Sequence, residues 1–379
     1  MRKWMTLAVF GLAAAMTVGA LNLQAADTIK VGVVAPLTGP SAEIGNYQIQ
    51  GAKLAVQEIN KAGGVLGKQV ELIIEDDQTT NPGIIMAFSK LVGNKDIVGF
   101  LGSIRSTQVN AMSPDVMKVG KPVMIGGTDP TLTHMGNPWY FRTRPNDSYS
   151  ARVIAEYGVK TLGKKKWAIV HSTDTFGTSG MKALVESLKG MGITPVLIQG
   201  YTNNSSDYTP VALAVKRSGA DVLASYVPFE TDLGIIAKQL RQVGVTMPWV
   251  GSATNMSTTA LRLAGPALYE TFAVADFARE SCPGAEAYAT KYEAAYNKAR
   301  PDHFSAWAYD GMHVLALAIN NAKSTDPAKI RQAILAIQGY KGAEGTYNFD
   351  KNGDGLHGYN VVKNVKGTIV FEKHIDFKD

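Results

Sequence analysis

The stretch from Ile29 to Pro82 is IKVGVVAPLTGPSAEIGNYQIQGAKLAVQEINKAGGVLGKQVELIIEDDQTTNP. Its first seven residues form a short apolar run rich in β-branched side chains, which favours a buried strand. Residues 43–62 place apolar side chains at helical spacing, and the glycines that follow are typical of a helix end. The run at 70–76 is a second strand, so the stretch predicts a β-α-β unit.

The same alternation of strands and helices continues along the chain and implies parallel sheets with helices on both faces. The pattern restarts after residues 142–147, so we expect two α/β domains of about 150 residues each. In the first domain we expect helices at 82–92 and 106–118 and strands at 96–102 and 122–127. In the second domain we expect helices at 148–162, 179–191 and 209–219. Its expected strands lie at 166–172, 194–200, 220–226 and 247–251.

The last third of the chain departs from this pattern. Two helical stretches, 284–299 and 303–322, follow the strand-like run at 271–277 with no strand between them, and Asp326-Pro327 begins a third helix. Three β-stretches close the chain, at 345–350, 359–364 and 367–375. Because this tail does not repeat the strand-helix pattern, it must pack against the two domains that the preceding residues form. We therefore expect it to complete those domains.

The N-terminus has the plan of a secretory signal peptide. A basic start at 1–4 precedes the apolar run 5–21, and the small residues at 22–27 offer a cleavage site after Ala25. We therefore expect export to the periplasm and a mature chain that begins at Ala26 or Asp27. A retained membrane anchor is the alternative, and the processing site argues against it.

Composition narrows the possible function classes. Loss of Arg2 and Lys3 with the signal peptide lowers the formal net charge from +6 to +4, and we expect no nucleic-acid partner. Cys282 is the single cysteine, which excludes a disulfide within the chain. The histidines lack ligand spacing, and Val361 stands where a calcium loop starting at Asp350 needs an acid, so no metal or other cofactor is expected.

The sequence contains no recognisable catalytic motif. Ser179 lies in GTSGM (177–181), which lacks the glycine that a nucleophile elbow places two residues after its serine. His171 and Asp174 have no serine at a spacing that indicates a triad. We therefore expect a protein that is not an enzyme, and a periplasmic hydrolase or amidase is an alternative.

Polar residues gather where the predicted strands end. Ligands of open parallel sheets bind outside the carboxyl ends of the strands, so these loops form the candidate binding surface. They are Pro36–Gly39, Gly102–Thr107 and Gly126–Asp129 in the first domain, and Ser172–Gly177, Tyr226–Glu230 and Gly251–Asn255 in the second.

The chain resembles the periplasmic binding proteins of ABC transporters, in the branch of the leucine/isoleucine/valine-binding proteins. The resemblance starts with the stretch 29–82 and continues through STQ (106–108), GGTDPTL (126–132), AIVHSTDTFGTSG (168–180) and FDKNGD (349–354). It implies an α/β fold of two Rossmann-like parallel-sheet lobes joined by three hinge crossovers, near Arg144-Pro145, Val274–Phe277 and Phe349–Asp354. Lobe 1 would hold residues 26–144 and 277–350, and lobe 2 would hold residues 145–276 and 351–379.

The resemblance also implies a function. The protein would capture a small carboxylate, such as an amino acid or a related organic or aromatic acid, in the cleft between the lobes. The lobes would close around it, and the protein, a monomer, would deliver it to the permease of an ABC importer. A ligand-sensing periplasmic module for a separate receptor is the alternative.

The ligand contacts of the family correspond to individual residues here. The serine-rich loop that holds the ligand carboxylate corresponds to Ser103, Arg105, Ser106 and Thr107. The small-small-Thr stretch corresponds to Gly126, Gly127 and Thr128, the aromatic wall residue to Phe176, and a further wall segment to Pro228–Glu230, with Phe229 and Glu230 as candidates.

Two departures from the family bear on the ligand. Ala253 stands where leucine-binding proteins have the acid that anchors the amine, and Ile44 replaces a tyrosine. We therefore expect a small carboxylate with no strict need for an α-amino group. Glu230 or Asp310 would anchor an amine, although Asp310 in its apolar helix also fits a buried residue that bonds to backbone.

Arg105 lies at the predicted start of the helix 106–118, where the helix dipole disfavours a cation. A guanidinium at this place fits a carboxylate bidentately, so we expect Arg105 to bind the ligand's carboxylate together with Ser103, Thr107 and the amides of 126–128. The alternatives are a solvated arginine and an arginine paired with an acid across the lobes.

Overall fold

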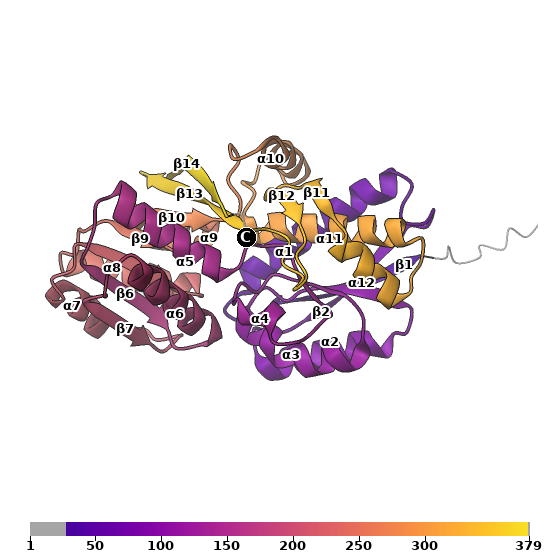
Figure 1. Cartoon of the computed structure of the whole chain (residues 1–379), viewed down its shortest axis with the longest axis horizontal. Coiled ribbons are helices and arrows are strands. Elements are labelled where there is room, and N and C mark those ends of the chain that lie inside the picture. The colour runs from indigo at the N-terminus through magenta and orange to yellow at the C-terminus, as the bar shows by residue number, and fades with distance from the viewer. Residues whose placement is uncertain (1–27, 378–379) are drawn as a thin grey trace, which may run out of the picture.

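The structure is a computed structural model that describes residues 28–377 (Figure 1). The described chain forms two α/β lobes that lie side by side along the long axis of the molecule. The predicted signal peptide and its cleavage site after Ala25 lie outside the described residues. Among residues 28–377, no helix has the length and apolarity needed to cross a membrane.

Lobe 1 is built on a five-stranded parallel sheet in the order β2-β1-β3-β4-β5. The strands are β1 (Ile29–Ala35), β2 (Val70–Asp76), β3 (Ile97–Leu101), β4 (Val123–Ile125) and β5 (Tyr140–Arg142). One face of the sheet packs against α1 (Ala42–Lys61), α11 (His303–Ala322) and α12 (Pro327–Leu335), and α10 (Pro283–Ala295) lies beside these helices. The other face of the sheet packs against α2 (Asn81–Gly93) and α3 (Ser106–Val119). The helix α4 (Thr131–His134) precedes β5. The sheet is therefore buried on both faces, as its continuous apolar strands predict.

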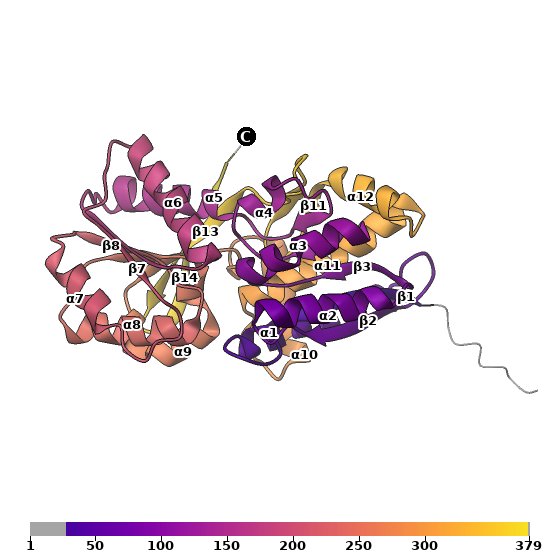
Figure 2. The ribbon, with the colours of Figure 1, turned by 90° about the horizontal axis from the view of Figure 1, so that it is seen from below.

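Lobe 2 is built on a seven-stranded sheet in the order β14-β13-β10-β9-β8-β6-β7. Figure 2 shows this lobe from below, with β7, β8, β13 and β14 labelled. Its parallel strands are β6 (Trp167–Ser172), β7 (Leu197–Tyr201), β8 (Val222–Tyr226), β9 (Trp249–Gly251) and β10 (Phe272–Ala275). Strands β13 (Gly358–Val365) and β14 (Thr368–Asp376) add an antiparallel edge, so this sheet is mixed. The helices α5 (Asp147–Glu156) and α6 (Thr175–Gly190) cover one face, and α7 (Thr209–Arg217), α8 (Glu230–Gln242) and α9 (Thr258–Ala264) cover the other.

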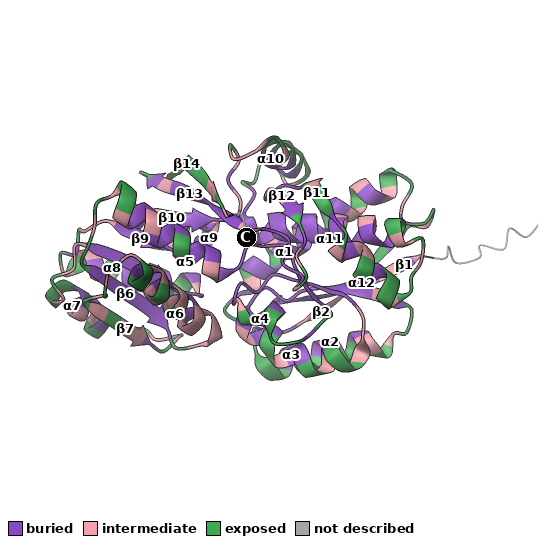
Figure 3. Cartoon of the chain, in the orientation of Figure 1, coloured by how far each residue is buried: buried purple, intermediate pink, exposed green. Residues whose placement is uncertain are grey.

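The chain passes between the lobes three times, which confirms the predicted fold class. It leaves lobe 1 after β5, returns after β10, and leaves again after the hairpin of β11 (Gln338–Lys341) and β12 (Thr346–Asn348). The first and third crossovers are tied together: Arg142 Nε donates to Asp354 Oδ1 at 2.8 Å, and Asn146 Nδ2 donates to Asp354 Oδ2 at 2.9 Å. Figure 3 shows buried strands at the centre of each lobe and exposed residues on the outer helix faces.

Several elements differ from the sequence predictions. The helix predicted over 148–162 is α-helical only to Glu156 and continues as a π-helix over Tyr157–Thr161. There Gly158 packs so closely on the Trp167 ring that a Cβ would lie 2.3 Å from it, so local packing shapes this end of the helix. The predicted helix 284–299 ends at Ala295, and β5, β11, α4 and α9 were not predicted from the sequence.

Candidate ligand-binding cleft

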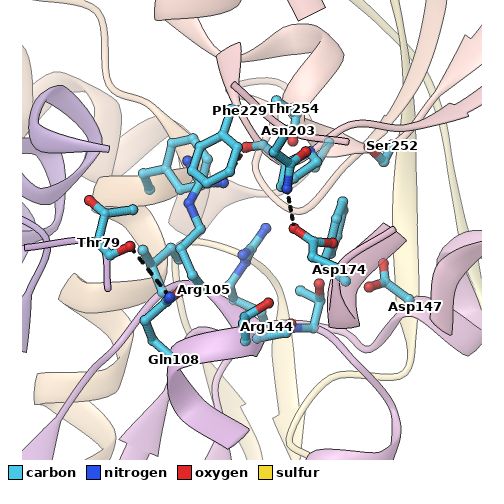
Figure 4. A pocket seen from close by; sticks show the side chains of 18 of the residues that line it. Thr79, Arg105, Gln108, Arg144, Asp147, Asp174, Asn203, Phe229, Ser252 and Thr254 are labelled. Carbon is cyan, nitrogen blue, oxygen red and sulfur yellow. Dashed lines mark hydrogen bonds between the residues drawn. The ribbon is translucent and has the colours of Figure 1, made fainter. Parts of the chain in front are cut away.

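A cleft of about 410 Å³ lies between the two lobes at the carboxyl ends of their strands (Figure 4). Six of the ten predicted site residues line it: Arg105, Ser106, Thr107, Thr128, Phe176 and Phe229. The other wall residues include Thr79, Asn81, Gln108, Arg144, Asp147, Asp174, Asn203, Ser252, Thr254, Phe304 and Tyr359. Both lobes contribute, so a molecule in this cleft contacts the two at once.

The start of helix α3 forms the wall of the cleft in lobe 1. Its first turn contains Ser106 and Thr107, and the side chain of its N-cap residue, Arg105, forms no cap hydrogen bond. Ser106 Oγ accepts hydrogen bonds from the N–H groups of Thr128 and Asp129, both at 3.1 Å, which joins α3 to the loop after β4. Uncapped N–H groups and the positive end of a helix dipole favour an anion here.

Three predicted residues lie behind this wall and are not among those that line the cleft. Ser103 is fully buried and its hydroxyl donates to Asp77 Oδ2 at 2.6 Å. A Cβ on Gly126 would lie 2.7 Å from the Ile104 side chain and 2.8 Å from the Trp307 ring, so this glycine permits close packing. Gly127 O accepts a hydrogen bond from Arg142 Nη1 at 3.0 Å. Each of the three supports the wall through packing or hydrogen bonds.

Arg105 reaches across the cleft to lobe 2. Its Nη2 lies 3.2 Å from Glu230 Oε2, its Nη1 donates to Pro228 O, and its Nε donates to Ser41 Oγ at 3.0 Å. The Arg105 guanidinium also lies over the Phe229 ring, 5.1 Å from its centroid. The structure thus gives Arg105 the partner that the sequence analysis considered as an alternative, an acid across the lobes. Its predicted contact with a ligand carboxylate stays a prediction.

Glu230 does not line the cleft and is almost fully buried behind it. As the first residue of α8 it lies at the positive end of that helix, where an acid is favourable. Burial raises the pKa of Glu230 to about 7, and the positive charge of Arg105 opposes the shift. Its Oε2 pairs with Arg105, whereas its Oε1 accepts no hydrogen bond from any residue in the range 28–377.

Asp310 has the structural role that the sequence analysis gave as its alternative. Its carboxylate accepts hydrogen bonds from the N–H groups of Ala343 and Glu344, at 2.8 and 2.9 Å, and from the Tyr347 hydroxyl at 2.8 Å. It is fully buried and does not line the cleft. This arrangement anchors the β11–β12 hairpin to α11.

Two acids that line the cleft have no place among the predicted site residues. Asp174 caps α6 and accepts hydrogen bonds from Gly177 N, Ser172 Oγ and Asn203 Nδ2, at 2.9, 2.7 and 2.8 Å. Asp147 is 2% exposed and stands at the start of α5. The end of β6 pointed toward Asp174, but Asp147 follows β5, a strand of three residues that gave no sequence signal.

Arg144 joins the cleft to the crossovers. Its Nε donates to Asp276 in the second crossover, and its Nη1 donates to Gly126 O at 2.9 Å. Both partners of the ion pair are buried. The two cleft arginines, Arg105 and Arg144, therefore each have an acidic partner, and the Phe304 ring lies 5.7 and 5.8 Å from their guanidinium carbons.

Ala253 lines the cleft, as its predicted position requires, whereas Ile44 is buried in α1 and does not. Among residues 28–377, no cluster of three or more His, Cys, Asp or Glu side chains is arranged to hold a metal ion. The chemistry that these walls offer is hydrogen bonding, charge pairing and aromatic contact.

Comparison with known proteins identifies the relatives of this chain. Residues 28–368 match the model of a family described as periplasmic binding protein. A protein named Leu/Ile/Val-binding protein homolog 3 from Brucella melitensis is 30% identical over 348 residues, which cover 90% of this chain and 92% of that protein. A leucine-, isoleucine-, valine-, threonine-, and alanine-binding protein from Pseudomonas aeruginosa is 28% identical over 357 residues, 93% of this chain and 92% of that protein.

A solved structure agrees with these relatives. The crystal structure of a type 1 periplasmic binding protein from Bordetella pertussis superposes with a TM-score of 0.84 at 27% identity, covering 91% of this chain and 100% of that one. The two-lobed fold, the cleft between the lobes and the match along almost the whole described chain lead to one conclusion: this protein belongs to the periplasmic binding protein family, in the branch of the Leu/Ile/Val-binding proteins.

Proposed function

We propose that this protein is the solute-binding component of an ABC importer, that it captures a small carboxylate in the cleft between its lobes, and that it delivers this solute to the permease without catalysing a reaction. The observation that carries the proposal is the uncapped first turn of α3, which faces a cleft lined by both lobes. The relatives from Brucella melitensis and Pseudomonas aeruginosa are amino-acid-binding proteins by their printed names, which supports the same ligand class.

The ligand carboxylate is placed at the start of α3. There Ser106, Thr107 and Thr128 line the cleft, and the N-cap residue of α3 offers no side-chain hydrogen bond to the N–H groups of the first turn. A carboxylate gains charge-assisted hydrogen bonds from such donors and a favourable interaction with the helix dipole. Phe176 and Phe229 offer apolar walls for the remainder of the solute.

Binding is coupled to closure of the lobes in this proposal. The contacts that bridge the lobes include Arg105 with Glu230, Arg262 with Glu43 at 2.6 Å, and the Thr258 N–H with Asp302 at 2.6 Å. Two lobes joined only by short crossovers favour rigid-body hinge motion, and such contacts form when the lobes approach each other.

The lobe boundaries are part of the same proposal, with residues 26–144 and 277–350 in lobe 1 and residues 145–276 and 351–379 in lobe 2. The sheets support this division, since β1–β5 lie in one sheet and β6–β10 with β13 and β14 lie in the other. We place the mature protein in the periplasm as a monomer, exported by a cleaved signal peptide.

A thermal-shift screen of the mature protein tests the proposed function. The screen contains amino acids, their deaminated acids, aromatic acids such as benzoate, and the matching amides. A ligand at 100 times its dissociation constant stabilises the folded protein by about 2.7 kcal/mol, which shifts the melting temperature by several degrees. Stabilisation by carboxylates and not by their amides supports the proposal, and a flat response to every carboxylate contradicts it.

A further inference from the structure

Two carboxamide side chains line the cleft, one from each lobe, and the oxygen atom of each lacks a hydrogen-bond partner. Gln108 lies in the first turn of α3 in lobe 1 and is 7% exposed, and Asn203 follows β7 in lobe 2. No residue in the range 28–377 donates to Gln108 Oε1 or to the buried Asn203 Oδ1. Because buried polar groups of proteins almost always have a partner, these two oxygens require an explanation.

The nitrogen atoms of both carboxamides are already engaged, which fixes the direction of each oxygen. Asn203 Nδ2 donates to the Asp174 carboxylate at 2.8 Å. Gln108 Nε2 lies 3.2 Å from Asn81 Oδ1 and 3.5 Å from the backbone oxygen of Thr79. A carboxylate and a backbone carbonyl both accept hydrogen bonds, so each must face the nitrogen of its carboxamide (Figure 4). The opposite edge of each carboxamide, which carries the oxygen, remains for a donor from elsewhere.

The fold brings these two side chains to the same part of the cleft. Helix α3 of lobe 1 and helix α6 of lobe 2 contact each other. Gln108 belongs to the first turn of α3, and Asp174, which holds Asn203, is the N-cap residue of α6. A small group bound between the starts of these helices therefore faces an acceptor oxygen from each lobe.

Two hydroxyl groups of lobe 2 also line the cleft without a partner. Ser252 and Thr254 follow β9 and are 2% and 4% exposed. Neither hydroxyl forms a hydrogen bond with a residue in the described part of the chain. Since a hydroxyl group can donate, the wall offers donors for an acceptor atom of the solute in addition to the two carboxamide oxygens.

The charges of the cleft disfavour a second anionic group beside these side chains. Asp174 is in direct contact with Asn203, and the two arginines that line the cleft, Arg105 and Arg144, are paired with acids. No lysine is among the described residues that line the cleft. A carboxamide fits the arrangement, because it presents two N–H donors to two acceptor oxygens and one C=O acceptor to a hydroxyl group.

We propose that the solute carries a terminal carboxamide at the end opposite its carboxylate, and that the oxygens of Gln108 and Asn203 accept its two N–H groups. The Ser252 or Thr254 hydroxyl donates to its C=O. This inference rests on the proposed function and adds to it the chemical class of the solute's far end. An alkyl group at that end would leave the oxygens without partners, which a site built for hydrogen bonding penalises strongly.

The experiment is calorimetric titration of solute pairs that have nearly the same shape and differ in the far end. Asparagine is paired with leucine, succinamate with 4-methylpentanoate, and glutaramate with 5-methylhexanoate, so the pairs cover solutes with and without an amine and two chain lengths. Succinate and 4-aminobutanoate place an anion or an ammonium group at the far end instead.

The titrations use wild type, Asn203→Leu, Asn203→Ala and Gln199→Leu. Gln199 is a matched control, because it lies in β7, does not line the cleft and donates to Gly200 O at 2.8 Å. Each variant is first checked for folding by its melting curve, and Asn203→Ala serves where Asn203→Leu does not fold.

We expect wild type to bind the carboxamide of at least one pair thirtyfold or more tighter than its alkyl partner. Replacing Asn203 should lower this preference at least tenfold and change the affinity for the alkyl partner less than threefold. The Gln199→Leu variant should keep the wild-type preference.

Two kinds of result would overturn the inference and leave the proposed function standing. One is equal binding within every pair, or binding of other small carboxylates but of no terminal carboxamide. The other is tighter binding of succinate or 4-aminobutanoate than of any carboxamide. If wild type binds none of these acids and no other small carboxylate, the proposed function itself is wrong and the inference falls with it.

Discussion

Arg105 at the start of α3 and Glu230 at the start of α8 form an ion pair across the cleft, with 3.2 Å between Nη2 and Oε2. A cation is unfavourable at the start of its own helix, and the acid at the start of the facing helix compensates for it. Because each partner belongs to a different lobe, the pair exists only while the lobes are close together. We propose that this ion pair stabilises a closed arrangement of the lobes, and we call it the latch.

The latch predicts that replacing either partner, Arg105 or Glu230, costs the same free energy of solute binding. Arg105→Ala and Glu230→Gln should each weaken binding of a stabilising solute by about 2 kcal/mol or more, since each leaves a buried partner without its mate. The double variant should bind no worse than the weaker single variant, which a double-mutant cycle by calorimetry measures. Arg262→Ala is the control, because its bridge to Glu43 is exposed and should contribute at most about 1 kcal/mol.

A different outcome would return Arg105 to the role expected from the sequence. If Arg105→Ala lost binding while Glu230→Gln bound like wild type, the guanidinium would act on the ligand carboxylate itself. The latch would then be wrong, and the cross-lobe pair would have no energetic role in binding.

Asp147 should also make the free energy of unfolding depend on pH. Its pKa is about 7 in the folded protein against an ordinary value of 3.8, so the folded protein holds a proton that the unfolded chain has lost between these pH values. Wild-type stability therefore falls as the pH rises through this window, and Asp147→Asn lacks this loss. The variant should gain about 2–3 kcal/mol relative to wild type between pH 5 and pH 8. Urea unfolding at both pH values measures the gain, and a constant difference would contradict the assignment.

Replacing Arg144 and replacing Glu344 by a neutral side chain should change the free energy of unfolding by different amounts. Arg144 is the partner of Asp276, so Arg144→Gln leaves a buried carboxylate unpaired and should cost about 3–5 kcal/mol of unfolding free energy. Neither oxygen of the nearby Glu344 accepts a hydrogen bond from the described part of the chain, and burial holds its pKa well above its ordinary range. Glu344→Gln replaces a neutral acid with a neutral amide and should therefore cost less unfolding free energy than Arg144→Gln at pH 7. Equal losses in urea unfolding would refute this view of the pair and of Glu344.

The mature N-terminus is a prediction from the sequence alone. Intact-mass analysis of exported protein should give a chain that begins at Ala26 or Asp27. A mass that retains residues 1–21 would show that the segment is an anchor.

The fold followed from the sequence because long periodic segments and strand runs alternate along it, and the C-terminal third could be placed once the family was known. Part of the binding cleft could also be predicted from the sequence. The rule that ligands bind at strand ends located Ser106, Thr107, Thr128 and Phe176 on the cleft wall, since these follow strands that the sequence predicted. It missed Asp147, because β5 was not predicted, and it placed Ser103 and Gly126 on the surface although packing buries them.

The sequence also could not predict which charged residues pair with each other, for a related reason. Arg105 and Glu230 are 125 residues apart in the chain, and their contact depends on how two separately folded lobes meet. No local pattern encodes such a contact. Glu230 was a candidate for the amine only because its partner was unknown.

The most direct test of solute capture in the cleft is a crystal structure of the mature protein with the carboxylate that stabilises it most. The account predicts closed lobes around the ligand and a ligand carboxylate within about 3 Å of the first-turn N–H groups of α3 and the Ser106 hydroxyl. A ligand bound outside the cleft, or one whose carboxylate faces lobe 2 and leaves the start of α3 without an anion, would contradict it.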